Sequence, residues 1–299
     1  MIPTYNQEEY IAEAIESALG QDYPNLEVIV TDDCSKDRTG EIAKRYTTDP
    51  RFRYILNETN LGRVGNYHNT LYTHATGEWI INLDGDDYYT DSKFISRAMN
   101  RVIADPDIVC HFAKKFISPN LSKYINNQIA VKTFLFDGKE YFKEFFNIGG
   151  FAHAGALYKR DIAINDKLCY TFDGIQSDFH GIIRLVLHGK IILSQDDGYK
   201  WRVHHTNATM SVNNKQKYKS ELICQQRIIQ DLQSNLISDT EKKNWLDAGK
   251  IWARKQYCLD CMNLENSLHG LGIGLKHFQF NIPYSIMMTK SLLRYIKML

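Results

Sequence analysis

The fold of this 299-residue chain is decided at residues 27–33, which read Glu-Val-Ile-Val-Thr-Asp-Asp. A β-branched run that ends in carboxylates predicts a buried strand followed by a polar loop. Residues 79–87, Trp-Ile-Ile-Asn-Leu-Asp-Gly-Asp-Asp, repeat the pattern. Amphipathic helices are predicted over residues 8–19 and 37–46; the first would bury Ile11, Ala14, Ile15 and Ala18. This alternation predicts an α/β fold, a Rossmann-like and mostly parallel central sheet flanked by helices.

Carboxylates gather directly after both predicted strands. Asp32 and Asp33 follow the first strand, and Asp84, Asp86 and Asp87 follow the second. Parallel strands present ligands at their carboxyl ends, and crowded carboxylates repel one another unless a cation lies between them. The pattern predicts a divalent ion, Mn²⁺ or Mg²⁺, bound together with diphosphate oxygens. The alternative is that these residues cap helices or stabilise turns, although the glycine within the second group would let a ligand approach the backbone.

The totals of the sequence exclude several classes of protein. The formal charge is +1, from 36 basic and 35 acidic residues, so no overall field favours nucleic acid and none is expected as a partner. Six cysteines are scattered along the chain, without the spacing of a disulfide framework. Cys258 and Cys261 form a C-x-x-C pair, for which zinc binding, redox chemistry and plain helix packing are the alternatives.

Membrane contact is expected only near the carboxyl end. The sequence has no run of about 18 apolar residues and no amino-terminal signal pattern, so the protein is expected in the cytoplasm. After Glu265 no acidic residue follows, and on a helix over residues 284–299 Lys290, Arg294 and Lys297 would share one face. Such a basic helix would hold the protein at the inner face of the membrane. Packing against the core or a second copy is the alternative.

Four ordered segments carry a resemblance to a known family. They are residues 3–6 (Pro-Thr-Tyr-Asn), 32–35 (Asp-Asp-Cys-Ser), 60–62 (Asn-Leu-Gly) and 83–87 (Leu-Asp-Gly-Asp-Asp). In these motifs residues 1–206 resemble the family 2 glycosyltransferases, whose fold is called GT-A. Further on, Asp178 with Leu185, His188 and Gly189 looks like the family's general-base segment, and residues 201–204 (Trp-Arg-Val-His) resemble its later aromatic element. The resemblance implies an inverting hexosyltransferase that uses a nucleotide-sugar donor.

The resemblance also assigns a donor site. Pro3, Thr4 and Tyr5 would border the nucleotide base, and Asp33 would accept a hydrogen bond from a uracil ring, so a UDP-sugar is the expected donor. Asp84 would approach the ribose and the metal.

A metal contact follows from the same resemblance. Asp86 would be the chief protein ligand of Mn²⁺ or Mg²⁺, and His204 would touch the metal or the diphosphate, with His205 competing for that role. Arg63 is a candidate by its own chemistry, since a guanidinium suits a phosphate or a base; solvation at the surface is the alternative.

The resemblance implies that Asp178 takes the proton from an acceptor hydroxyl as its oxygen attacks the sugar. Asp87, His153 and Trp201 are candidate contacts to the sugar or the acceptor. His153 lies in the glycine-rich residues 149–155, which are expected to line the cleft or to form a tight structural turn. The acceptor is expected to be a glycan or a lipid-linked saccharide, in surface polysaccharide biosynthesis.

Two departures from the family pattern stand out. Only Met1 and Ile2 precede Pro3, so the first strand is short or the native start lies upstream. Residues 176–178 read Gln-Ser-Asp where many relatives carry Glu-Asp. The chain is expected to divide into a nucleotide-sugar-binding half (1–112) and an acceptor-binding half (113–210) of one GT-A domain, followed by a helical extension (211–299).

Two other functions remain open. A nucleotidyltransferase of related fold would need a glycine-rich, basic segment near the first strand, where this chain has Pro-Thr-Tyr-Asn. A non-catalytic relative that only binds a sugar or a nucleotide would lack the metal or base carboxylates.

Overall fold

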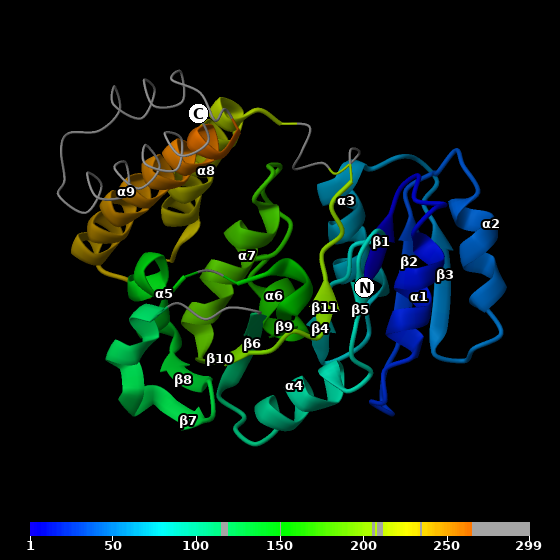
Figure 1. The fold of residues 1–299 in the computed structure, drawn as a ribbon, viewed down its shortest axis with the longest axis horizontal. Coiled ribbons are helices and arrows are strands. Elements are labelled where there is room, and N and C mark those ends of the chain that lie inside the picture. The colour runs from blue at the N-terminus through cyan, green and yellow to red at the C-terminus, as the bar shows by residue number, and fades with distance from the viewer. Residues whose placement is uncertain (115–118, 150, 205–206, 208–211, 234, 265–299) are drawn as a thin grey trace, which may run out of the picture.

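The computed structural model describes residues 1–114, 119–149, 151–204, 207, 212–233 and 235–264. The first third of the chain forms a parallel sheet with the order β1 (Ile2–Thr4), β2 (Val28–Asp32), β3 (Phe52–Leu56). The strands expected at residues 27–31 and 79–83 are present as β2 and β4 (Trp79–Ile81). Figure 1 shows β1, β2 and β3 together on one side of the molecule, with α1 and α2 beside them.

The two predicted helices are present, and both are shorter than predicted. The first is α1 (Ile11–Leu19), which buries Ile11, Ala14, Ile15 and Ala18 as expected. The second is α2 (Thr39–Ala43), continued by a 3-10 turn (Lys44–Tyr46). A further helix, α3 (Gly62–Asn69), leads into a π-helical turn (Thr70–His74).

The rest of the chain builds a six-stranded sheet with the order β4, β9 (Ala156–Lys159), β6 (Ile108–Lys114), β10 (Lys190–Gln195), β8 (Thr133–Asp137), β7 (Gln128–Ala130). Only β6 and β10 pair in parallel here, and the other four pairs are antiparallel. A small antiparallel ribbon joins β5 (Tyr88–Tyr89) to β11 (Tyr199–Lys200). The sheet is therefore mixed, and the parallel order predicted for it is found mainly in the first half.

The backbone of Met1 joins the two sheets. Its amino group donates to the carbonyl of Ile81 (2.9 Å), and its carbonyl accepts from the amide of Leu83 (3.0 Å). The short β1 thereby lies beside β4 as well as β2. As a result, the loops that follow β1, β2 and β4 all open at the same edge of the sheet.

Shorter helices cover the six-stranded sheet. They are α4 (Phe94–Val102), α5 (Gly138–Ile148), α6 (Arg160–Asn165) and α7 (Ser177–Leu185), with 3-10 turns at Pro119–Asn127, His153–Gly155 and Val186–His188. The predicted boundary between residues 112 and 113 falls inside β6, and the division into halves stays a prediction.

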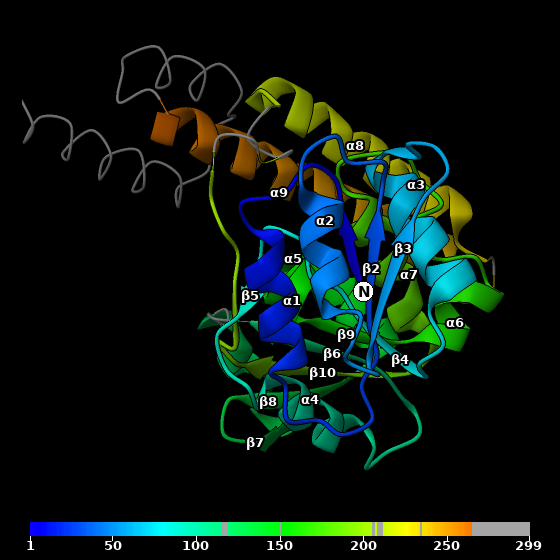
Figure 2. The same cartoon turned by 90° about the vertical axis from the view of Figure 1, so that its right-hand side faces the viewer.

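The chain continues into two long helices, α8 (Asn214–Asp231) and α9 (Asp239–Leu264), as the predicted helical extension requires. Figures 1 and 2 show them side by side at one end of the molecule. They pack on the helices of the core through Trp245, which is buried and stacks on Phe142 with ring centroids 4.9 Å apart. The side chains of Cys258 and Cys261, and the basic residues 284–299, lie outside the part of the chain that is described.

Candidate active site

A cleft of about 680 Å³ opens where β1, β2 and β4 end. Most of the predicted site residues line it: Pro3, Thr4, Tyr5, Asp33, Arg63, Asp84, Asp86, Trp201 and His204. Asp87, His153 and Asp178 do not line it. The structure thus brings together the residues predicted to bind the donor and the metal. The predicted base, Asp178, lies close to this cleft but does not line it.

Asp33 is held in place by the segments that follow β3. Its Oδ1 accepts hydrogen bonds from the Asn57 side-chain amide (2.9 Å) and from the backbone of Leu61 (2.8 Å). Its own carbonyl accepts from the Asn60 side chain (3.0 Å). Buried polar groups need such partners, so the Asn-Leu-Gly segment is explained by its contact with Asp33.

Asp32, next to it, has a structural role. Its Oδ1 accepts from the backbone of Ser35 and its Oδ2 from the hydroxyl of Tyr54, both at 2.8 Å. It does not line the cleft. For Asp32 the turn-stabilising alternative therefore describes the contacts that are observed.

The acidic loop after β4 holds three carboxylates with different partners. Asp84 accepts a hydrogen bond from the buried Tyr67 hydroxyl. Asp86 Oδ2 lies 2.7 Å from His204 Nε2. Asp87 Oδ1 accepts from the backbone of Arg202 (2.9 Å). Asp87 is thus turned toward the protein.

Burial and crowding raise the proton affinity of this loop. Burial is the main cause that raises the pKa of Asp86, and the charge of Asp84 adds to it. Burial also raises the pKa of Asp87 to about 7, against the hydrogen bond from Arg202, which lowers it. Negative groups that are costly to keep ionised together are stabilised by a cation.

Gly85 allows the acidic loop to lie against β1. A Cβ atom at this position would come within 2.2 Å of Gln7 Oε1 and 2.8 Å of Thr4 Oγ1. Gly85 was predicted to let a ligand approach the backbone. In the structure it instead allows close contact with Thr4 and Gln7. Thr4 and Gln7 are themselves joined by a hydrogen bond of 2.5 Å.

The segment after β11 crosses the acidic loop and is anchored by Arg202. Its guanidinium lies over the rings of Tyr10 (5.0 Å) and Tyr88 (4.9 Å), pairs with Glu13 and donates to the carbonyl of Asp86 (2.9 Å). These contacts fix the residues that follow Arg202 in the chain.

His204 is the next residue in this segment to reach the loop. Its ring stacks on Tyr10 with centroids 4.7 Å apart, and Asn207 also donates to Asp86 (3.3 Å). His205, the competing candidate, lies outside the described residues.

Asp178 lies in the first turn of α7, and its carboxylate faces His153. His153 Nδ1 lies 3.4 Å from Asp178 Oδ2. Burial alone would raise the pKa of Asp178, but the hydrogen bond and charge of His153, together with the charge of Arg63, hold it below the ordinary value. An aspartate in this setting stays ionised at neutral pH, which a general base requires.

Arg63 connects the cleft with the loop before Asp178. Its Nη2 donates to the carbonyls of Gly174 (2.8 Å) and Ile175 (3.1 Å). Sequence reasoning expected this guanidinium to meet a phosphate or a base. The contacts observed are with the protein backbone, and Ile175 itself lines the cleft.

Several residues of the site were missed from the sequence. Tyr67 contacts Asp84, and Tyr10 contacts His204. Asn207 contacts Asp86. In each pair the two residues are far apart in the chain. Tyr67 and Tyr10 look like ordinary residues of helical segments, so nothing in the sequence predicts that they belong to the site. Asn207 lies three residues after the Trp-Arg-Val-His segment, and this closeness was the one available sign.

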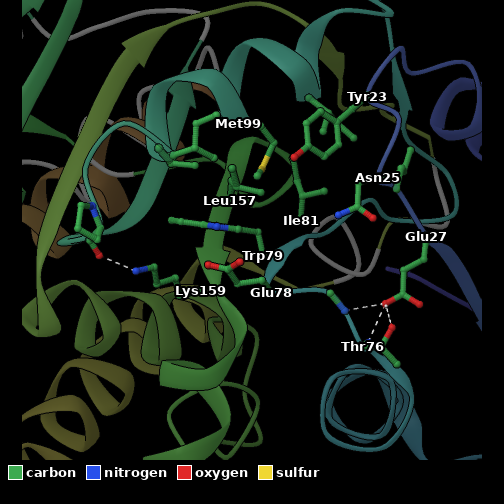
Figure 3. Close-up of a pocket in the computed structure, with 16 residues that line it drawn as sticks. Tyr23, Asn25, Glu27, Thr76, Glu78, Trp79, Ile81, Met99, Leu157 and Lys159 are labelled. Carbon is green, nitrogen blue, oxygen red and sulfur yellow. Dashed lines mark hydrogen bonds between the residues drawn. The ribbon is translucent and has the colours of Figure 1, made fainter.

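A second hollow of about 650 Å³ lies at the opposite end of β4, lined by Trp79, Met99 and Leu157 among others (Figure 3). Two of its charged groups, Glu27 and Lys159, have partners in the protein. Glu27 accepts from the backbone amides of Thr76 (2.7 Å) and Gly77 (2.9 Å), and Lys159 donates to the carbonyl of Pro106 (2.6 Å). None of the predicted site residues lines this hollow.

The cleft offers few protein ligands for a metal. Within the described ranges, no three His, Cys, Asp or Glu side chains are placed so that they could hold an ion by themselves. The donor chemistry of Asp84 and Asp86 suits Mn²⁺ or Mg²⁺, because these ions prefer carboxylate oxygens and take further oxygens from a phosphate. In the same part of the chain, no helix is both long and apolar enough to span a membrane.

Known proteins resemble this chain over part of its length. Over 90 residues the chain is 40% identical to the poly(ribitol-phosphate) beta-N-acetylglucosaminyltransferase TarS of Staphylococcus aureus, a match that covers 29% of this chain and 16% of that protein. The matched segment therefore makes up only a small part of the length of TarS.

Solved structures show the same fold. TarS 1–349 in complex with UDP-GlcNAc superposes with a TM-score of 0.62 at 19% identity, covering 92% of this chain and 78% of that one. The mannosyltransferase PcManGT of Pyrobaculum calidifontis, in complex with GDP-Man and Mn²⁺, gives 0.61 at 19% identity, with 97% and 82% covered. The GT-A fold is thereby established. The profile of glycosyl transferase family 2 matches residues 1–165, and this chain belongs to that family.

Proposed function

We propose that this protein transfers a sugar from a nucleotide donor, with UDP as the nucleotide, to a hydroxyl of a glycan or lipid-linked acceptor in surface polysaccharide biosynthesis. The observation behind the proposal is that Asp33, Asp84 and Asp86 line the same cleft. Arg63, which also lines this cleft, donates a hydrogen bond to the loop before Asp178. The UDP-GlcNAc complex of TarS supports the choice of donor, and the polymer in the name of TarS supports a polymeric acceptor.

The chemistry is a single displacement with inversion. The acceptor oxygen forms a bond to the anomeric carbon while the bond from that carbon to the nucleoside diphosphate breaks. The hydroxyl proton passes to the carboxylate of Asp178, which His153 holds in place. A positioned base of this kind contributes about 10²–10⁴ in rate.

Asp33 is proposed to accept a hydrogen bond from the uracil ring, with Pro3, Thr4 and Tyr5 around the base. The aromatic side chains of Tyr5 and Trp201 are each about half exposed at the cleft. Exposed aromatic faces suit stacking on a base or a sugar, so Trp201 remains a candidate contact to the sugar.

Asp84, Asp86 and His204 would hold Mn²⁺ or Mg²⁺ together with the diphosphate. When bound, the ion supplies positive charge that stabilises the departing nucleoside diphosphate. The raised pKa of Asp86 supports this proposal. Repulsion from Asp84 causes part of this rise, and a bound cation would relieve that repulsion.

A donor-turnover assay tests the function. The protein is incubated with Mn²⁺ and UDP-GlcNAc, UDP-glucose, UDP-galactose, dTDP-glucose or GDP-mannose, and the released nucleotide is identified by chromatography. Release of UDP from a UDP-sugar, abolished by Asp86→Asn and kept by the exposed-site control Asp247→Asn, is expected. Release of a nucleoside monophosphate would indicate a nucleotidyltransferase-type reaction. Binding without turnover would indicate a non-catalytic relative.

A further inference from the structure

Among the described residues, hydrogen-bond donors reach only one of the two carboxylate oxygens of Asp33. Its Oδ1 accepts from the side-chain amide of Asn57 (2.9 Å) and from the backbone amide of Leu61 (2.8 Å), whereas Oδ2 has no donor. Asp33 is 2% exposed and lines the cleft. The unpaired atoms that are fully buried in the described residues do not include Oδ2, so this oxygen is the one that a ligand in the cleft can reach.

The direction of the Asn57 amide is set by its neighbours. Asn66 Nδ2 donates to the backbone carbonyl of Thr31 (2.9 Å), a group that can only accept. Asn66 Oδ1 therefore faces Asn57, and it accepts from Asn57 Nδ2 (2.9 Å). On its other side, Asn57 Oδ1 accepts from Asn69 Nδ2 (2.9 Å). A flipped Asn57 amide would turn its oxygen toward the oxygens of Asn66 and Asp33, so the network selects the orientation that donates to Asp33.

Burial makes this arrangement rigid. Asn57 follows β3 and Asn66 belongs to α3, and both side chains are buried. Thr70 Oγ1 donates to the backbone carbonyl of Asn66 (2.7 Å) from the next turn. Any other arrangement of buried amides leaves a donor or an acceptor unpaired, at a cost that solvent does not relieve. The network therefore keeps Oδ1 of Asp33 occupied and leaves Oδ2 for the ligand.

The chemistry of Oδ2 decides which ligand group can meet it. An ionised aspartate only accepts hydrogen bonds, so the group opposite Oδ2 must carry an N–H or an O–H. The uracil ring carries a hydrogen on N3. The cytosine ring has the same size and shape, but its N3 has no hydrogen and is itself an acceptor. A buried oxygen that faces another acceptor is left unpaired, and a site of this kind rejects such a ligand.

We propose that Asn57 is a positioning residue for nucleotide recognition, which holds Asp33 so that its Oδ2 selects uracil over cytosine. The inference deepens the proposed function and rests on it. Asn57 does not itself line the cleft, so it acts on the nucleotide through Asp33. The pattern of selectivity then depends on a residue that the nucleotide does not touch.

The test compares the Kd for UDP with the Kd for CDP, measured by calorimetry with Mn²⁺ on the full chain. Both nucleotides carry the same ribose and diphosphate, so the contribution of the metal cancels in the ratio of the two constants. The wild type is expected to prefer UDP about 10- to 100-fold. In Asn57→Ala this preference should fall about 3- to 10-fold, mainly through weaker binding of UDP, because Oδ1 then keeps only the amide of Leu61.

A matched control separates positioning from stability. Gln21 is also a buried amide, with hydrogen bonds to the backbone of Asp91 (2.9 Å) and Ile95 (3.0 Å), and it does not line the cleft. Gln21→Ala should lower the free energy of unfolding and leave the ratio of the two Kd values unchanged. A role of Asn57 in folding alone would likewise leave that ratio unchanged.

A second variant tests the orientation without any change in Asn57. In Asp33→Asn the new amide must keep its oxygen toward the donors of Asn57 and Leu61, so its nitrogen takes the place of Oδ2. A donor then faces the base, and the preference should turn toward CDP, whose N3 accepts. In the double variant Asp33→Asn with Asn57→Ala the amide has one anchor fewer, so the ratio should return toward one.

The outcomes separate the two claims. An unchanged ratio in Asn57→Ala, or an equal fall in Gln21→Ala, overturns the role of Asn57 and leaves the transfer function standing. An Asp33→Asn protein that prefers UDP also overturns it, and this result decides the matter if Asn57→Ala does not fold. Equal binding of UDP and CDP by the wild type overturns the inference alone. If the wild type binds neither nucleotide, the proposed function fails, and this inference fails with it.

Discussion

Asp87 is buried and Asp178 is partly buried, both close to the same cleft, but their surroundings shift the pKa values of the two carboxyl groups in opposite directions. Asp87 has Asp84 and Asp86 in the same loop, and burial raises its pKa to about 7. Asp178 has His153 and Arg63 nearby, and its pKa is held low. The environment, more than the residue type, therefore separates the proposed base, Asp178, from the loop carboxylate Asp87.

Replacement of Asp178 by asparagine is expected to remove the base and to leave donor binding intact. The rate of transfer should fall about 10²- to 10⁴-fold, because an amide cannot take the acceptor proton. The Kd for UDP with Mn²⁺, measured by calorimetry, should stay unchanged, since Asp178 does not line the cleft. Unchanged turnover would remove Asp178 from the mechanism.

Asp87 gives the protein a pH dependence that Asp87→Asn should remove. A carboxyl group with a folded-state pKa of about 7 binds a proton more tightly in the folded state than in the unfolded chain, where its pKa is about 3.9. Its contribution to stability is complete below about pH 4 and is lost as the pH rises through 7. In EDTA, the Tm of the wild type should therefore fall relative to Asp87→Asn between pH 5 and 8, while Asp247→Asn should follow the wild type.

At the scale of elements, the close contact between the acidic loop and β1 depends on Gly85. The space beside its Cα is filled by Thr4 of β1 and by Gln7 from the loop that follows β1. An added methyl group must therefore push these side chains or the loop away. The positions of the carboxylates depend on this contact.

Gly85→Ala is expected to lower stability by about 1–3 kcal/mol and to weaken UDP binding. The Oε1 atom of Gln7 would be the nearest atom, at 2.2 Å, and it ends a flexible side chain. The double variant Gly85→Ala with Gln7→Ala should therefore recover part of the lost stability in a denaturant titration. If it recovers none, the Thr4 contact or the loop backbone carries the cost.

Sequence patterns predicted the elements whose signals are local. Helix α1 shows its buried face through residues three and four apart, and β2 through a β-branched run. The pairing of the six-stranded half was not predictable, because strand direction there depends on contacts between segments such as β6 and β9, which are far apart in the chain. The same reason hid Asn57, whose importance comes from its hydrogen bond to Asp33, a residue far away in the chain.

For the whole molecule, the extension is joined to the core by aromatic packing. Trp245 of α9 stacks on Phe142 and also lies near Phe146 and Phe179, with ring centroids 4.9 and 6.5 Å away. Trp245 is only 2% exposed. A contact that excludes water so fully makes α8 and α9 part of the folded unit.

Trp245→Ala is expected to destabilise the protein by about 3–5 kcal/mol, the usual cost of emptying a large aromatic site. Trp201→Ala is a matched control, because Trp201 is 50% exposed and its loss should cost far less stability. Urea denaturation of both variants, followed by tyrosine and tryptophan fluorescence, measures the difference. Equal free energies of unfolding would show that the extension is only loosely attached.

The pairing of Met1 with Ile81 and Leu83 has a mechanical consequence. Backbone hydrogen bonds run from β3 through β2 and β1, across Met1, to β4 and β9, so we expect the strands under the cleft to move together. A ligand that enters or leaves the cleft is therefore expected to be accommodated by the side chains at its rim, such as Tyr5 and Trp201, which are about half exposed.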